Sequence, residues 1–144
     1  MHAPNPDFAA RLEKVVLAMP LAREIGLAFR SITAGAVELE IPYREQLSFR
    51  PGQMQATAIF AAADFAAVAA AATLLPPGWA NATIDCALKI IGPADGGKLV
   101  ARGKVVNAGR LLTVSSAEVY SVRDGREALC ATALATARNI EPRQ

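Results

Sequence analysis

A single acidic side chain, Asp64, interrupts the otherwise apolar and alanine-rich stretch Gln55–Leu75. Burying a charge without a partner is costly, so such a carboxyl group is held neutral, bound by hydrogen-bond donors, or used in a reaction. Alanine is the strongest helix former, and the stretch therefore predicts one buried helix with Asp64 in its middle. A structural acid bonded to the backbone or to an arginine is the alternative to a catalytic one.

The only histidine of the chain, His2, lies next to the N-terminus. Serine and cysteine triads, acid–histidine dehydratase pairs and most catalytic zinc sites all need an imidazole. Any chemistry here is therefore expected to run without histidine. Cys86 and Cys130 lie in apolar, strand-like segments without metal-ligand spacing, which predicts buried reduced thiols. We expect neither a metal nor a cofactor.

Length and charge narrow the class of protein. A chain of 144 residues with a formal net charge of +2 is typical of one domain that does not bind nucleic acid, since no run of Lys or Arg occurs. A membrane span is not expected, because alanine favours insertion little and Asp64 would lie at the bilayer centre. The first residues lack the pattern of a signal peptide, so we expect a cytoplasmic protein.

Hydrophobic periodicity divides the chain into a helical segment, 1–24, and a larger domain, 25–144. In the first, apolar residues at helical spacing predict a short amphipathic helix that covers the domain and ends before Pro20. The larger domain begins with a predicted β-hairpin of two strands, Ile25–Thr33 and Ala36–Pro42. A polar loop then leads into the alanine-rich helix.

After Pro76-Pro77-Gly78 the period of the apolar residues changes to two. Tight turns containing glycine divide this part into four predicted antiparallel strands: Thr83–Ile91, Lys98–Asn107, Leu111–Val122 and Ala128–Asn139. An antiparallel sheet of about six strands must curl around a single long apolar helix to bury it. The sequence therefore predicts an α+β protein with the hot-dog fold.

The order of motifs over residues 25–139 resembles that of the small acyl-CoA thioesterases of the phenylacetate-pathway family. There, a loop glycine precedes a His-Gly-Gly that opens the central helix, and an Asp or Glu follows farther along it. Here Gly52-Gln53-Met54-Gln55-Ala56-Thr57 stands in that place, and Asp64 falls at the position of the acid. Ala82-Thr83-Ile84-Asp85 is similar to the start of the family's third strand, and Asn107-Ala108-Gly109-Arg110 to its basic turn.

This resemblance implies hydrolysis of an acyl-CoA thioester. The backbone N–H of Ala56 would bind the oxyanion, Asp64 would attack the carbonyl or activate water, and Thr83 would orient that water. Gln55 would take the place of the family's histidine at the same site. The substrate, including the phosphates of coenzyme A, would be contacted by Thr57, Phe49, Gly52, Arg110 and Lys98.

Three departures from the family pattern favour an alternative to hydrolysis. Gln55 replaces a histidine and cannot titrate, Ala56 replaces a glycine and adds a methyl group, and Phe49 replaces a frequent asparagine. A non-catalytic or very slow acyl-CoA-binding hot-dog protein is therefore the second hypothesis. A hot-dog hydratase is disfavoured because it would need a histidine.

The spacing of the site residues also bears on assembly. Gln55 and Asp64 lie nine residues apart, which is roughly 13 Å along a helix and places them on opposite sides of it. Two chains related by a two-fold axis can exchange these groups, whereas one chain cannot easily bring both to one substrate. We therefore expect a homodimer or homotetramer whose sites are shared between chains.

Overall fold

The computed structural model describes all residues from Met1 to Gln144. It begins with two short helices, α1 (Phe8–Leu17) and α2 (Pro20–Glu24). Leu12 and Val16, one turn apart, are the buried residues of α1 and join the main hydrophobic core. The predicted amphipathic helix is thus confirmed.

The second helix was not predicted, and it changes the start of the hairpin. Pro20 was expected to lie beyond the end of the helix, yet it occupies the first position of α2, where its missing N–H has no intrahelical partner. Ile25, predicted to open a strand, instead follows the last residue of α2. The first strand begins three residues later, at Ala28.

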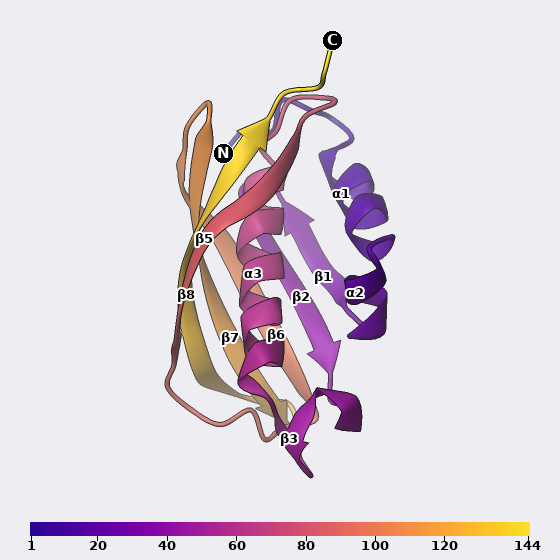
Figure 1. Ribbon diagram of the computed structural model, residues 1–144, viewed down its shortest axis with the longest axis vertical. Coiled ribbons are helices and arrows are strands. Elements are labelled where there is room, and N and C mark those ends of the chain that lie inside the picture. Colours follow the sequence, from indigo (N-terminus) through magenta and orange to yellow (C-terminus); the bar gives the residue numbers. More distant parts are fainter.

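One antiparallel sheet of six strands forms the body of the molecule (Figure 1). Its spatial order is β1-β2-β6-β7-β8-β5, which leaves β1 and β5 at the two edges. The strands are β1 (Ala28–Thr33), β2 (Ala36–Pro42), β5 (Ala80–Ile90), β6 (Lys98–Ala108), β7 (Leu112–Arg123) and β8 (Arg126–Ile140). All six predicted strands are present, and the polar loop adds a 3-10 turn and two short strands: η1 (Glu45–Leu47), β3 (Ser48–Arg50) and β4 (Gln53–Met54).

The central helix α3 (Ala56–Ala72) lies in the concave face of this sheet, with α1 on the β1 side and β5 on the other (Figure 1). Every buried residue of α3 except Ile59 is an alanine. A Cβ atom placed on Gly103 of β6 would lie 2.0 Å from the carbonyl oxygen of Ala66, so helix and sheet backbones are nearly in contact. Small residues on both elements permit this approach, and the arrangement is the predicted hot-dog fold.

Two further features bear on what the domain can contact: the length and polarity of its helices, and the free edge of its sheet. No helix of the structure is both long and apolar enough to cross a membrane. The edge strand β5 pairs only with β8, and it carries exposed apolar side chains, among them Ile84 and Ile90. An unpaired edge of this length offers backbone donors and acceptors to another strand.

Candidate active site

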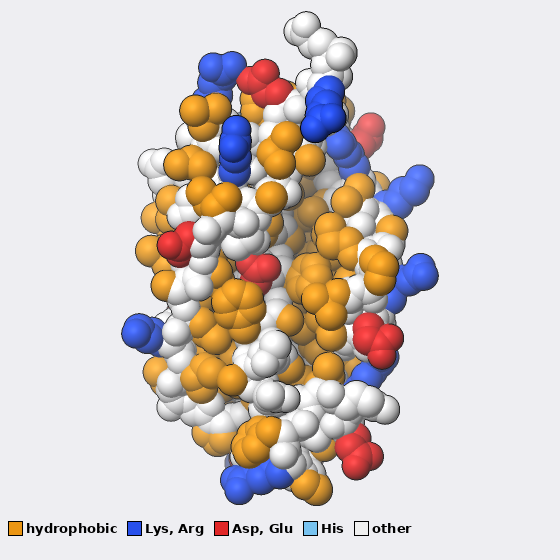
Figure 2. Space-filling view, viewed as in Figure 1, with side chains coloured by type: hydrophobic (Ala, Val, Ile, Leu, Met, Phe, Trp, Pro, Cys, Tyr) orange, Lys and Arg blue, Asp and Glu red, His pale blue; other side chains and the backbone are white.

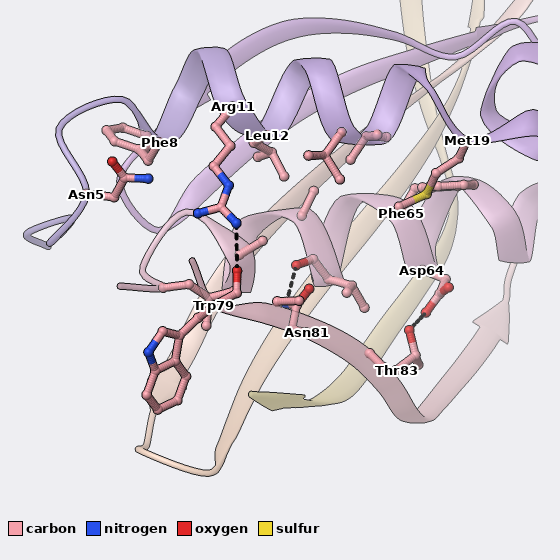
Figure 3. A pocket seen from close by; sticks show the side chains of 18 of the residues that line it. Asn5, Phe8, Arg11, Leu12, Met19, Asp64, Phe65, Trp79, Asn81 and Thr83 are labelled. Atoms are coloured by element: carbon pink, nitrogen blue, oxygen red, sulfur yellow. Dashed lines mark hydrogen bonds between the residues drawn. The ribbon is translucent and has the colours of Figure 1, made fainter. Parts of the chain in front are cut away.

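Asp64 lies in the middle of α3, on the side that faces the start of β5 (Figure 3). The hydroxyl Oγ1 of Thr83 donates a hydrogen bond of 2.8 Å to its Oδ1 atom. The pairing of β5 with β8 shifts register between Thr83 and Asp85, and such bulges re-aim side chains. The structure therefore brings together the two residues, helix acid and strand hydroxyl, that the sequence suggested for one site.

The surroundings of Asp64 favour its neutral form. Burial raises the pKa of this carboxyl above its ordinary value of 3.8, and the hydrogen bond from Thr83 partly opposes the shift. None of the ion pairs in the structure includes Asp64, so the structural alternative of an acid paired with arginine does not apply. A carboxyl group with a raised pKa is better matched to proton transfer near neutral pH.

Strand β5 also carries Asp85 and Cys86, close to Thr83. The pKa of the Cys86 thiol is raised, first by burial and then by the negative charges of Asp64 and Asp85, so the thiol stays protonated at neutral pH. No three His, Cys, Asp or Glu side chains come together as a metal site would require. The chemistry available beside Asp64 is thus that of a carboxyl and a hydroxyl group.

A cavity of about 430 Å³ opens beside this pair, between α1, α3 and the start of β5. Hydrophobic side chains gather on both sides of this hollow (Figure 2). Asp64 and Thr83 lie at one end of it, and Asn5, Phe8 and Arg11 lie at the other (Figure 3). Since 13 of its 19 lining residues are hydrophobic, the cavity suits an apolar ligand whose reactive end lies at Asp64.

The start of α3 presents free backbone donors. Gln55, which precedes the helix, makes no side-chain capping bond, and its own N–H donates to the carbonyl of Leu47 at 2.7 Å. Ala56 and Thr57, the first two helical residues, are exposed, and their N–H groups have no intrahelical acceptor. These donors, with the positive end of the helix dipole, suit an oxygen that gains negative charge.

Within one chain, however, these donors do not reach Asp64. Ala56 and Asp64 are separated by eight residues of continuous α3, which is about 12 Å along the axis. The cavity beside Asp64 is lined by the second half of α3 and not by its start. The predicted site residues thus form two groups at different places on the helix.

Phe49 and Gly52 belong to the short β3–β4 hairpin that leads into α3. Phe49 is exposed, and the guanidinium of Arg50 lies over its ring at 5.3 Å from the centroid. Gly52 has a φ of +81° and donates its N–H to the hydroxyl of Tyr43 at 2.9 Å. Both residues thus accompany the start of the helix, on the Ala56 side of the divided site.

The two predicted phosphate-binding cations lie far apart. Lys98 begins β6 and Arg110 follows its end, and an 11-residue strand spans about 35 Å. Lys98 pairs with Glu40 at 3.0 Å, and Arg110 pairs with Glu141 at 2.8 Å. One chain therefore cannot present both cations to the same coenzyme A molecule at one end of the sheet.

One part of this site, the cavity wall formed by α1, could not be predicted from the sequence. Phe8, Leu12, Val15 and Val16 all line it. Their helical spacing predicts an apolar face, yet that pattern cannot distinguish a face that packs completely from one that leaves a space. Only the placement of α1 over α3 shows that a space remains.

Comparison with known proteins places the chain in a family. The thioesterase superfamily matches residues 56–128, just over half of the chain. A thioesterase family protein from Silicibacter pomeroyi is 30% identical, with a TM-score of 0.90 over 93% of this chain and 98% of that one. A phenylacetic acid degradation-related protein from Ralstonia eutropha is 25% identical, with a TM-score of 0.76 over 91% of this chain and 98% of its own.

A thioesterase from Haemophilus influenzae shares the fold at 17% identity, with a TM-score of 0.85 over 100% of this chain and 98% of that one. No curated protein sequence matches the chain. The family match begins at the first residue of α3 and includes both Asp64 and Thr83. On this evidence the chain belongs to the thioesterase superfamily.

Proposed function

We propose that this protein hydrolyses an acyl-CoA thioester to the free acid and coenzyme A, at sites shared between the two chains of a homodimer. The observation that carries the proposal is the Thr83–Asp64 hydrogen bond at the end of an apolar cavity. It supplies a carboxyl group with a raised pKa, an oriented oxygen partner and a place for an acyl group.

Asp64 acts on the thioester carbonyl in one of two ways, as a nucleophile or as a general base. As a base, it takes a proton from water while the water oxygen bonds to the carbonyl carbon. The C–S bond then breaks, and the coenzyme A thiolate leaves with the electron pair. A thiolate is a good leaving group, so no histidine is needed to protonate it. Thr83 holds Asp64, and its hydroxyl lies where it can also position the water.

The N–H of Ala56 in the partner chain would stabilise the oxyanion formed in this step. The separation of about 12 Å between Ala56 and Asp64 along α3 supports the use of two chains. Each dimer then holds two equivalent sites, and each site combines the start of one α3 with Asp64 of the other chain. Gln55, Thr57, Phe49 and Gly52 accompany the donor side, and the side-chain amide of Gln55 can still donate a hydrogen bond.

The edge strand β5 is the surface that we assign to dimer formation. Its free edge lies next to the open side of α3, where Phe60 is 38% exposed, and Ile84 and Ile90 are exposed on the strand itself. Antiparallel pairing of two β5 strands would extend the sheet across the dimer and bury these side chains.

The second candidate function is binding without turnover. It is favoured by Gln55 and Ala56, which stand where the family pattern has histidine and glycine. One assay separates the two functions: release of free thiol from a panel of acyl-CoA thioesters by the wild type and by Asp64→Asn. Hydrolysis predicts release that the variant loses by about a hundredfold or more. Equal rates for both proteins on every substrate would favour binding alone.

A further inference from the structure

We propose that the cavity between α1 and α3 binds the acyl chain of the substrate, and that this chain is apolar and about ten carbons long. The inference rests on the proposed hydrolysis at Asp64, and it adds the class of acyl group. It also assigns α1 as the helix that covers the acyl chain.

The length follows from how α3 lines the cavity. Asp64, Val68 and Ala72 all line it, and their spacing of four residues places them in one row along the helix. The row extends about 12 Å from the acid to the end of α3. A saturated carbon chain with bonds of about 1.5 Å and angles of about 111° advances roughly 1.25 Å per carbon. The row therefore accommodates about ten carbons.

Most of the wall offers no hydrogen-bond partner, and each of its polar side chains Asn81, Arg11 and Asn5 makes a hydrogen bond within the protein. Asn81 donates its side-chain N–H to the carbonyl of Val68 at 3.1 Å, and Arg11 donates to the carbonyl of Trp79 at 3.2 Å. The side-chain oxygen of Asn5 accepts the N–H of Asp7 at 3.0 Å. Since 13 of the 19 lining residues are hydrophobic, a hydroxyl or carboxylate on the acyl group would lose its water along most of the cavity without gaining a partner, which is unfavourable. The wall thus selects an apolar chain.

Helix α1, which covers the cavity, is held in place by packing and by a hydrogen bond. Leu12 and Val16 of α1 are 8% and 5% exposed and belong to the main core. The bond from Arg11 to the carbonyl of Trp79 joins the same helix to the start of β5. The acyl chain is therefore bound by the same protomer that supplies Asp64, while the partner supplies the oxyanion donor.

The first test is a series of straight-chain acyl-CoA substrates from acetyl to palmitoyl, assayed as kcat/KM. Each buried methylene is expected to raise kcat/KM by up to about fourfold, with no further gain once the chain reaches about ten carbons. Calorimetric titration with the thioethers S-ethyl-CoA and S-decyl-CoA measures the same preference without turnover.

Variants along the row of α3 locate the chain. Val68→Phe lies about 6 Å from the acid and should reduce kcat/KM for decanoyl-CoA by about a hundredfold or more while sparing butyryl-CoA. Ala72→Phe lies at the far end and should affect only the longest chains. Ala10→Phe, on the exposed side of α1, is the matched control and should change neither. If Val68→Phe does not fold, Val15→Trp enters the cavity from the half-exposed side of α1 and should give the same selective loss.

The outcomes separate this inference from the proposed function. Hydrolysis confined to short or aryl thioesters, unchanged in the cavity variants, would overturn the inference and leave thioester hydrolysis intact. Tight binding of S-decyl-CoA that Val68→Phe or Val15→Trp removes, without hydrolysis of any substrate, would support the cavity assignment and reject hydrolysis. Equal affinity for S-ethyl-CoA and S-decyl-CoA would contradict the acyl-chain assignment in either case.

Discussion

The hydroxyl of Thr83 donates a 2.8 Å hydrogen bond to Oδ1 of Asp64, and this contact joins the edge strand of the sheet to the middle of the central helix. It fixes the carboxyl group at the end of the α1–α3 cavity. It also lowers the pKa of Asp64 against the larger, opposite effect of burial. The reactivity of the acid should therefore depend on a residue from another element.

Replacing Thr83 tests this dependence. Thr83→Val keeps the shape but removes a hydrogen bond to a charged group, worth about 1.5 kcal/mol or more, so kcat/KM at neutral pH should fall by about tenfold. The pKa of Asp64 should rise further, and the acidic limb of the pH profile should move to higher pH. Thr83→Ser retains the hydroxyl and should restore both properties. Equal profiles for the valine and serine variants would show that the bond has no role in the reaction.

The pH dependence of hydrolysis should reflect the ionisation of one group, the carboxyl of Asp64. Asp64 must be ionised to act as base or nucleophile, so kcat/KM should rise with pH through a single transition that lies above 3.8, the ordinary value for aspartate. The profile should be the same after His2→Ala, which removes the only imidazole. A second ionisation near pH 6.5, the ordinary value for histidine, that disappears with this substitution would contradict the assignment.

The raised pKa of Asp64 also affects stability. The folded chain binds this proton more tightly than the unfolded chain, so the stabilisation is complete below 3.8 and is lost as pH rises through the folded pKa. Asp64→Asn cannot ionise. Its free energy of unfolding at neutral pH should exceed that of the wild type, and the difference should shrink as pH falls toward 3.8. Thermal melts over this range measure it, and a variant less stable than the wild type at pH 7 would count against the prediction.

Dimer formation through β5 and the open side of α3 can be tested by introducing a charged side chain on that surface. Phe60→Glu places a carboxylate on the surface that the partner would cover, and it should shift the protein toward monomers and lower activity with it. Leu21→Glu makes the same change at a residue of α2 that is 57% exposed and should leave the dimer intact. Light scattering at micromolar concentration distinguishes the species. A wild type that is a stable monomer would remove the basis for a shared site.

Much of this architecture could be predicted because local pattern and global fold agree. The alternation of the strands, the glycine turns and the alanine-rich helix each specify their own element, and one helix against six strands leaves few ways to bury it. The prediction that Pro20 follows the end of a helix was wrong, because proline is found both after helices and at their first position. Asp64 could be predicted as a site residue because burying a lone acid in an apolar helix is costly. The cavity under α1 was not found, because it depends on how closely two helices approach.

The proposed partition of the site between two chains rests on the separation of Ala56 and Asp64 along α3. Asp64→Ala removes the acid, and Ala56→Pro removes the proposed oxyanion donor, so each homodimer should lose activity by about a hundredfold or more. Proline fits at position 56 because the residue before it, Gln55, already has extended backbone angles of −71° and 152°. Both variants should therefore fold as the wild type does.

The most direct measurement is the activity of mixed dimers, assembled from the two variants under separate affinity tags and purified through both. A mixed dimer has one site with both lesions and one site with neither. The shared-site account predicts about half of the wild-type activity per mixed dimer. Verified mixed dimers as inactive as both parents would contradict it, because Ala56 and Asp64 would then act from one chain or one of them would have no part in the reaction.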